Sequence, residues 1–255
     1  MLLNGRSNHP AWEKLGKYRF AHRGYHDKPQ IPENSLPAFR RAAERGWGAE
    51  LDVHLLKDGT LAVFHDSDLR RCAGVDGKIE DLDLEGLKKL RLEGTDNPVP
   101  LFDEVLAIFE NATPLIIELK TANGNHYELS KAVCERLDSY KGDFCIESFD
   151  PRAVADVRKL RPEICRGQLA ENFLKNDEAL PYWQRLVLTK LWTNLFTRPD
   201  FIAYKFEDRM DLNNRRCVTK YGLQEVSWTI RSKEDLEAAE SVGAIPIFEK
   251  FDPEL

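Results

Sequence analysis

The hydrophobic positions of this chain fall into short apolar runs that are separated by stretches with helical spacing. Near-continuous apolar runs bounded by polar residues are typical of strands in a parallel sheet, because both faces of such strands are buried. The pattern predicts strands at residues 19–22, 49–55, 61–65, 115–119, 144–148, 164–169, 201–205, 225–229 and 245–248.

Between most of these strands the apolar residues recur at the spacing of one helix face. This spacing predicts helices at residues 35–44, 102–109, 127–137, 153–160 and 232–239. Gly46 follows the first of these helices as a stop signal, and Ser232 opens the last one as part of a capping box.

The alternation of strands and helices from end to end predicts an α/β protein with a parallel sheet and outer helices. Roughly eight such units in one chain match a TIM (β/α)8 barrel, so residues 1–255 are expected to form a single domain. An open doubly wound sheet is the alternative, but the first predicted strand lacks the Gly-rich dinucleotide loop. Residues 67–100 are longer than a normal connection and are expected to form a small insertion after the second strand unit.

Composition narrows the possible partners and location. Hydrophobic residues make up 42% of the chain, charged residues make up 31%, and the formal net charge is −6. This balance argues against a nucleic-acid binder with a broad basic face, although local cations can still bind a phosphorylated substrate. The N-terminus lacks the apolar core of a signal peptide, and the five cysteines contain no C-x-x-C pair. We therefore expect a soluble protein of the reducing cytoplasm.

One apolar stretch has two possible roles. Residues 180–197 are predicted to form a helix that is apolar over much of its circumference, with Trp183, Leu188, Trp192 and Phe196 among its large side chains. Such a helix either packs on the barrel wall, which we favour, or makes peripheral contact with a membrane.

Polar residues at alternate positions of one predicted strand indicate a site inside the barrel. Glu50, Asp52 and His54 fall on one face of the strand at 49–55, and Leu51 and Val53 fall on the other. Two carboxylates that point into a barrel are costly unless a cation compensates them. Oxygen ligands of this kind suit a hard divalent ion. His54 is interpreted either as a packed polar residue or as a group that supports the site.

Further charged residues are predicted at strand ends, which form the active-site face of a (β/α) barrel. His22 and Arg23 end the first strand, where an imidazole would stand beside a fixed cation. A hairpin turn at residues 58–59 returns His65 towards the same face. Glu118 and Lys120 share a face at the end of an apolar strand. Each of these features also has an ordinary structural explanation, such as a satisfied edge residue or an ion pair.

In combination, these features resemble the glycerophosphodiester phosphodiesterase family, which has a TIM-barrel fold. The matching stretches follow the family order and cover most of the chain: His22-Arg23-Gly24, Pro32-Glu33-Asn34-Ser35 with Ala38-Phe39, Glu50-Leu51-Asp52-Val53, Lys57-Asp58-Gly59, His65-Asp66, Val99-Pro100 before Glu104-Val105-Leu106, Glu118-Leu119-Lys120, Ser148-Phe149 and Trp228-Thr229.

The resemblance implies metal-dependent hydrolysis of glycerophosphodiesters to an alcohol and sn-glycerol 3-phosphate. Glu50, Asp52 and Glu118 would hold the divalent metal, Mg²⁺ or Ca²⁺, and Glu33 would lie near the site.

The resemblance also implies the remaining roles in the site. His22 and His65 would be the general acid and base, Arg23 and Lys120 would bind the phosphate, and Trp228 would line the substrate pocket.

The sequence departs from the usual family pattern at three places. Ser35 replaces a more common Thr, Arg231 stands in a stretch that more often reads Val-Asn, and residues 245–253 replace a Thr-Asp-Tyr-Pro ending. We expect none of these departures to touch the metal ligands or the histidines, so that only the substrate preference would differ.

Two rival functions remain at this point. The first is a phospholipase C- or lysophospholipase D-like enzyme that acts on membrane lipid or lysolipid. The second is a non-catalytic binding module on the same fold, which the paired histidines beside a metal site argue against.

Overall fold

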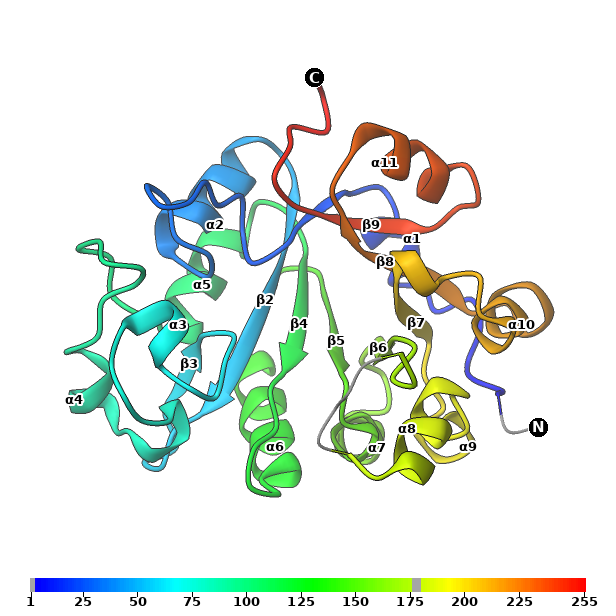
Figure 1. Ribbon diagram of the computed structural model, residues 1–255, viewed down its shortest axis with the longest axis horizontal. Coiled ribbons are helices and arrows are strands. Elements are labelled where there is room, and N and C mark those ends of the chain that lie inside the picture. The colour runs from blue at the N-terminus through cyan, green and yellow to red at the C-terminus, as the bar shows by residue number, and fades with distance from the viewer. Residues whose placement is uncertain (1–2, 176–179) are drawn as a thin grey trace.

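The computed structural model describes residues 3–175 and 180–255. Within these residues, eight parallel strands form a closed barrel, because β1 pairs with both β9 and β2 (Figure 1). The ninth strand, β3, lies outside the ring and runs antiparallel to β2. The strands are β1 (Phe20–Ala21), β2 (Gly48–Leu55), β3 (Leu61–Val63), β4 (Leu115–Leu119), β5 (Phe144–Ser148), β6 (Arg166–Ala170), β7 (Phe201–Lys205), β8 (Gln224–Ile230) and β9 (Ile245–Phe248).

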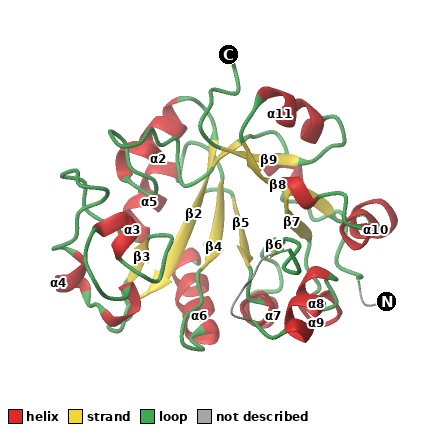
Figure 2. Cartoon of the chain, viewed as in Figure 1, coloured by secondary structure: helices red, strands yellow, loops and turns green. Residues whose placement is uncertain are grey.

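Helices lie around the outside of the barrel, as expected for a TIM (β/α)8 fold (Figure 2). They are α2 (Leu36–Glu44), α5 (Phe102–Phe109), α6 (His126–Leu137), α7 (Pro151–Leu160), α8 (Tyr182–Thr189), α9 (Asn194–Thr197), α10 (Leu212–Tyr221) and α11 (Lys233–Glu240), with a short 3₁₀ turn η2 (Phe206–Asp208) after β7. The first helix, α1 (Trp12–Leu15), instead packs with Phe20 and Phe201 where the strands begin.

Alternation along the strands separates two apolar layers. Leu51 and Val53 on β2 face outward and belong to the core that includes Phe39 of α2 and Val105 of α5. A second cluster, which includes Phe20, Ile116 and Phe201, fills the barrel where the strands begin. The charged residues of β2 and β4 therefore lie above an apolar floor, towards the strand ends.

The predicted insertion is present beside β3. It contains α3 (Arg70–Ala73), η1 (Ile79–Asp81) and α4 (Leu84–Leu87). Leu69, Ile79 and Leu87 pack with Phe64 in a separate apolar cluster. The insertion is thus a small folded unit that covers the hairpin after β2.

The prediction of one helix over residues 180–197 was wrong. The segment is divided into α8 and α9, because buried Leu191 has a left-handed backbone with a φ of 54°. Tyr182 and Trp183 at the start of α8 are 64% and 62% exposed, so the segment is only partly packed on the wall. Among the described residues, no helix is both long and apolar enough to cross a bilayer.

Candidate active site

Three buried carboxylates converge at the barrel mouth. Glu50 and Asp52 come from β2, and Glu118 comes from β4, where it pairs in register with Asp52. One oxygen of each carboxylate lies within 4.8 Å of the corresponding oxygens of the other two. The three acidic residues that the sequence predicts as metal ligands are therefore brought together by a single strand pair.

The electrostatics of this cluster are suited to a cation. Burial, followed by repulsion from the neighbouring carboxylates, raises the pKa of Glu50 well above its usual value, and burial also raises the pKa of Glu118. Burial opposes ionisation of Asp52 as well, but His65, Lys120 and Arg23 outweigh it and lower the pKa of Asp52.

A further observation supports a metal at these oxygens. Within the described chain, Asp52 Oδ1 is buried and accepts no hydrogen bond, and the nearest cationic group is Lys120 Nζ at 3.5 Å. Burying a carboxylate oxygen that accepts no hydrogen bond costs free energy unless a cation approaches it. The donor set of three carboxylates fits Mg²⁺ or Ca²⁺.

Glu147 is a fourth carboxyl group at this level of the barrel. It lies on β5 opposite Glu118 in the strand register and is 2% exposed. Burial, followed by repulsion from Glu118 and Asp52, raises its pKa well above the usual value. Among the described residues, the cluster that could hold a metal ion contains Glu50, Asp52 and Glu118 but not Glu147.

Two cations border the carboxylates, as the sequence predicts. Arg23 has a left-handed backbone with a φ of 55°, and this turn aims its main-chain N–H at Glu50 Oε2, 3.0 Å away. Its guanidinium Nε lies 3.6 Å from Asp52 Oδ2. Lys120 follows β4 directly, and its Nζ lies 3.0 Å from Glu118 Oε1. Both cations could meet an anion that binds at the cluster.

The two predicted imidazoles both lie near this cluster. His22 Nε2 is 4.0 Å from Glu50 Oε2, and His65 interacts electrostatically with Asp52 and Glu118. His65 Nδ1 lies 2.5 Å from Asp66 Oδ1, which leaves Nε2 as its free ring nitrogen for proton transfer.

His22 is held by a carboxylate that the sequence did not reveal as part of the site. Glu249, which follows β9, has its Oε2 2.7 Å from His22 Nδ1. Burial lowers the pKa of His22 to about 4, although the contact with Glu249 opposes this shift. The imidazole is therefore neutral at pH 7: Nδ1–H donates to Glu249, and Nε2 carries a lone pair towards the cluster.

The expectation that no departure from the family pattern touches the histidines was wrong. Glu249 belongs to the altered ending at residues 245–253 and contacts His22 directly. Arg231, another departure, donates from Nε to the second oxygen of the same carboxylate at 2.8 Å. The reason is geometric: β8 and β9 are neighbours, so the residues that follow them meet at the mouth beside β1.

Glu33 lies beside the site, as the sequence predicts, and binds several cations. Its carboxylate accepts from Arg23 Nη1 at 2.8 Å, from Arg71 Nη2 at 2.7 Å and from Lys28. Although burial opposes it, these contacts hold the pKa of Glu33 well below its usual range. The outcome is a buried anion that fixes Arg23 at the mouth.

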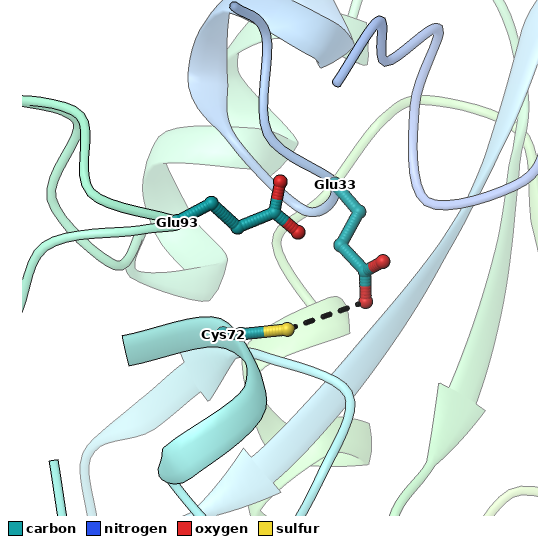
Figure 3. A group of neighbouring side chains, drawn as sticks. All are labelled: Glu33, Cys72 and Glu93. Carbon is teal, nitrogen blue, oxygen red and sulfur yellow. Dashed lines mark hydrogen bonds between the residues drawn. The ribbon is translucent and has the colours of Figure 1, made fainter. Parts of the chain in front are cut away.

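Figure 3 shows that Glu33 also lies near Cys72 and Glu93. This trio is a poor metal site, because its negative charge is already matched by the neighbouring Arg and Lys side chains. Burial raises the pKa of Cys72 to about 12, so its sulfur is a thiol that contacts Glu33 at 3.6 Å.

Trp228 lies at the edge of an aromatic wall. Its ring meets Phe149 edge-to-face with the centroids 5.6 Å apart, and Phe149 meets Phe173 at 6.0 Å. Phe149 and Phe173 line a cavity of about 670 Å³ that also includes Thr121, the residue after Lys120, and Trp183 of α8. The cavity therefore begins next to the predicted phosphate-binding residue and extends outward beneath α8.

Comparisons with known proteins agree with this fold. A model of the glycerophosphoryl diester phosphodiesterase family matches residues 22–251. A glycerophosphodiester phosphodiesterase from Caldanaerobacter subterraneus subsp. tengcongensis is 29% identical over 235 residues, which cover 88% of this chain and 89% of that protein.

Solved structures of phosphodiesterases have the same fold. A glycerophosphodiester phosphodiesterase from Thermotoga maritima has a TM-score of 0.68 and 26% identity, and the match covers 91% of this chain and 94% of that one. An Oleispira antarctica phosphodiesterase, solved with sn-glycerol-3-phosphate, has a TM-score of 0.77 at 24% identity and covers 96% of this chain and 95% of that one.

The closed barrel, the charged groups at its mouth and the family match together identify a TIM-barrel hydrolase. More specifically, the chain belongs to the glycerophosphoryl diester phosphodiesterase family, and its enzyme class is that of a phosphoric diester hydrolase. The predicted family, fold and enzyme class are thereby confirmed, and the non-catalytic binding module is not supported.

Proposed function

We propose that this enzyme hydrolyses glycerophosphodiesters to an alcohol and sn-glycerol 3-phosphate in a metal-dependent reaction. The main support is the cluster of Glu50, Asp52 and Glu118, whose oxygens approach within 4.8 Å with one oxygen of Asp52 left without a hydrogen bond. The Oleispira antarctica phosphodiesterase holds sn-glycerol-3-phosphate as its product, which is consistent with a glycerol phosphate product here.

In this proposal Glu50, Asp52 and Glu118 hold Mg²⁺ or Ca²⁺. The bound ion would offset negative charge on the phosphodiester and on its transition state. Arg23 and Lys120, which already lie against these carboxylates, bind the remaining phosphate oxygens. Trp228 borders the space for the substrate, and Glu33 keeps the guanidinium of Arg23 at the mouth.

The two imidazoles carry the proton transfers. One accepts the proton of the attacking hydroxyl, and the other protonates the oxygen of the leaving alcohol. His22 is suited to accept a proton, because it is neutral at pH 7 and its Nδ1–H is held by Glu249. His65 is oriented in a similar way by Asp66, with its Nε2 free.

The test is turnover of a panel of glycerophosphodiesters, scored by release of glycerol phosphate with Mg²⁺, with Ca²⁺ and with a chelator. We expect activity that a chelator abolishes, and we expect His22→Ala and His65→Ala each to lose at least about 10²-fold. His126→Ala serves as the control, because its imidazole pairs with Asp156 instead of the cluster. Full activity in either of the first two variants would overturn the assignment.

A phospholipase C- or lysophospholipase D-like activity is less well supported. The human lysophospholipase D is 36% identical, but only over 121 residues, which are 42% of this chain and 37% of that protein. The match to the Caldanaerobacter phosphodiesterase extends over most of both chains. A soluble glycerophosphodiester is therefore the substrate class that we propose.

We also infer that the single domain of residues 1–255 works in the cytoplasm and makes peripheral contact with membranes through residues 180–197. The five cysteines are all free and buried, which suits a reducing compartment. Tyr182 and Trp183 are exposed at the start of α8, and residues 180–197 contain two basic residues and no acidic one. Exposed Tyr and Trp rings favour a lipid surface.

A further inference from the structure

His54 is a buried imidazole that the proposed reaction does not use. It lies on the same face of β2 as Glu50 and Asp52, one step nearer the strand end, and is 2% exposed. At this position β2 pairs with β3, with His54 opposite Ala62. His54 therefore stands beside the hairpin that carries His65.

Both ring nitrogens of His54 face oxygen acceptors, so the ring donates to both partners only with a proton on each nitrogen. Nε2 lies 3.2 Å from the main-chain carbonyl oxygen of His65, and Nδ1 lies 2.7 Å from Glu80 Oε1. The second carboxylate oxygen of Glu80 accepts from Ser67 Oγ at 2.7 Å. The contacts thus lead from the carbonyl of residue 65, through His54 and Glu80, to the side chain of residue 67.

The partner of His54 comes from the insertion. Glu80 belongs to η1, and its neighbour Ile79 anchors that turn in the apolar cluster of the insertion. The main chain ties the same two segments together, because Ile79 N–H donates to Ser67 O at 3.0 Å. The insertion therefore holds Glu80 in place, and Glu80 fixes the plane of the His54 ring.

Burial of an imidazole and a carboxylate is costly unless their partners are well placed. The immediate effect of this network is to order residues 65–67. On the other side, the His65 ring is held by Asp66, whose Oδ2 accepts from Arg71 Nε at 2.5 Å. The main chain and the ring of His65 are thus fixed by two different sets of contacts.

We propose that His54, oriented by Glu80, is a positioning residue that donates to the His65 carbonyl and so sets where the His65 imidazole stands relative to Asp52 and Glu118. This inference rests on the proposed catalytic role of His65. A small displacement of a reacting group is sufficient to slow the chemical step without weakening substrate binding, because orientation contributes strongly to the rate.

The experiment measures kcat, KM and metal affinity of the full chain with glycerophosphocholine. We expect His54→Phe to lower kcat about 10- to 100-fold, while KM and metal affinity stay within about twofold. His54→Gln keeps an amide donor and is expected to recover part of the lost kcat. Glu80→Gln keeps an acceptor for the His54 Nδ1–H and is expected to lose less than Glu80→Ala.

The matched control is His126→Phe. His126 Nδ1 lies 2.6 Å from Asp156 Oδ2, so this variant also removes a His–carboxylate pair, but one between α6 and α7. We expect its kcat to remain at the wild-type value. An equal fall of kcat in His126→Phe would overturn the inference by marking the effect as a general loss of stability.

Two further results would contradict the inference. One is wild-type kcat in folded His54→Phe, and the other is a change in KM or metal affinity with unchanged kcat. If His54→Phe does not fold, the variants Glu80→Ala and Ser67→Ala test the inference, and wild-type kcat in both would contradict it. Full turnover in His65→Ala would overturn the proposed function itself, whereas an inactive His65→Ala beside a fully active His54→Phe would overturn only this inference.

Discussion

Glu249 Oε2 lies 2.7 Å from His22 Nδ1, and the other oxygen of Glu249 accepts from Arg231. The imidazole and its carboxylate are 227 residues apart in the sequence. They meet because β1 and β9 are hydrogen-bonded neighbours in the closed barrel. His22 therefore has its ring plane and its tautomer fixed from the last strand of the fold.

Removal of this carboxylate is expected to impair catalysis. Glu249→Ala leaves His22 Nδ1 without its acceptor, and we expect kcat to fall about 10- to 100-fold. Glu249→Gln keeps an acceptor oxygen and is expected to fall less. Lys250→Ala, at the exposed neighbour, should behave as wild type. Steady-state kinetics with glycerophosphocholine check the order of the three variants, and equal kcat in Glu249→Ala and wild type would contradict the role of Glu249.

Metal binding is expected to appear as thermal stabilisation. A divalent ion at about 100 times its Kd should add about 2.7 kcal/mol to the free energy of unfolding. For a chain of this size that corresponds to a Tm increase of roughly 5–10 °C. In Glu50→Gln we expect this increase to be lost, while the metal-free Tm is equal to or above that of wild type, because one of the mutually repelling carboxylates is gone.

Differential scanning fluorimetry with and without Mg²⁺ or Ca²⁺ measures both quantities. The exposed pair Lys88–Glu85 offers a control, since Glu85→Gln removes a carboxylate far less buried than Glu50. The metal assignment fails if Glu50→Gln retains the full metal-dependent rise in Tm.

The buried ion cluster around Glu33 predicts a pH dependence of stability. Its pKa in the folded chain is lowered by Arg71, Arg23 and Lys28, so the unfolded chain binds more protons once the pH falls below about 4.5. The stabilisation from Glu33 is complete above that pH and is lost at about 1.4 kcal/mol per pH unit below it. Denaturant unfolding at pH 6 and pH 3 should therefore show that wild type and Glu33→Gln differ less in free energy of unfolding at pH 3 than at pH 6. If the difference were the same at both pH values, Glu33 would have the same pKa in the folded and the unfolded chain.

The exposed start of α8 is expected to bind vesicles. We expect co-sedimentation of the wild-type chain with vesicles of phosphatidylcholine and phosphatidylglycerol, and loss of most of it in the Tyr182→Ser, Trp183→Ser double variant. Met210 and Leu212 are 72% and 61% exposed outside this segment, so the double variant Met210→Ser, Leu212→Ser is the matched control. Equal binding of the two double variants would exclude α8 as the contact.

The sequence was informative wherever a residue's role depends on its strand neighbours. Glu50 and Asp52 could be found because side chains alternate along a strand, and Glu118 could be found because its strand is otherwise apolar. Such patterns can be read from a few neighbouring residues of the sequence. The parallel pairing of β2 with β4 then brings the three carboxylates together.

The groups that hold the histidines could not be found in this way. Glu249 follows β9 and Glu80 lies in the short 3₁₀ helix η1, and nothing in their sequence neighbourhood distinguishes them from solvent-exposed carboxylates. Their partners are set by barrel closure and by the packing of the insertion. The break between α8 and α9 was missed for a related reason: a left-handed leucine at position 191 is imposed by tertiary packing and has no sequence signal.

Closure of the barrel by the pairing of β1 with β9 has a consequence for biosynthesis. A nascent chain that has emerged only as far as β8 already contains both imidazoles and all three carboxylates, but it lacks the acceptor of His22. Turnover should therefore begin only when the final strand leaves the ribosome and docks, so that incomplete translation products carry the site in an inactive form.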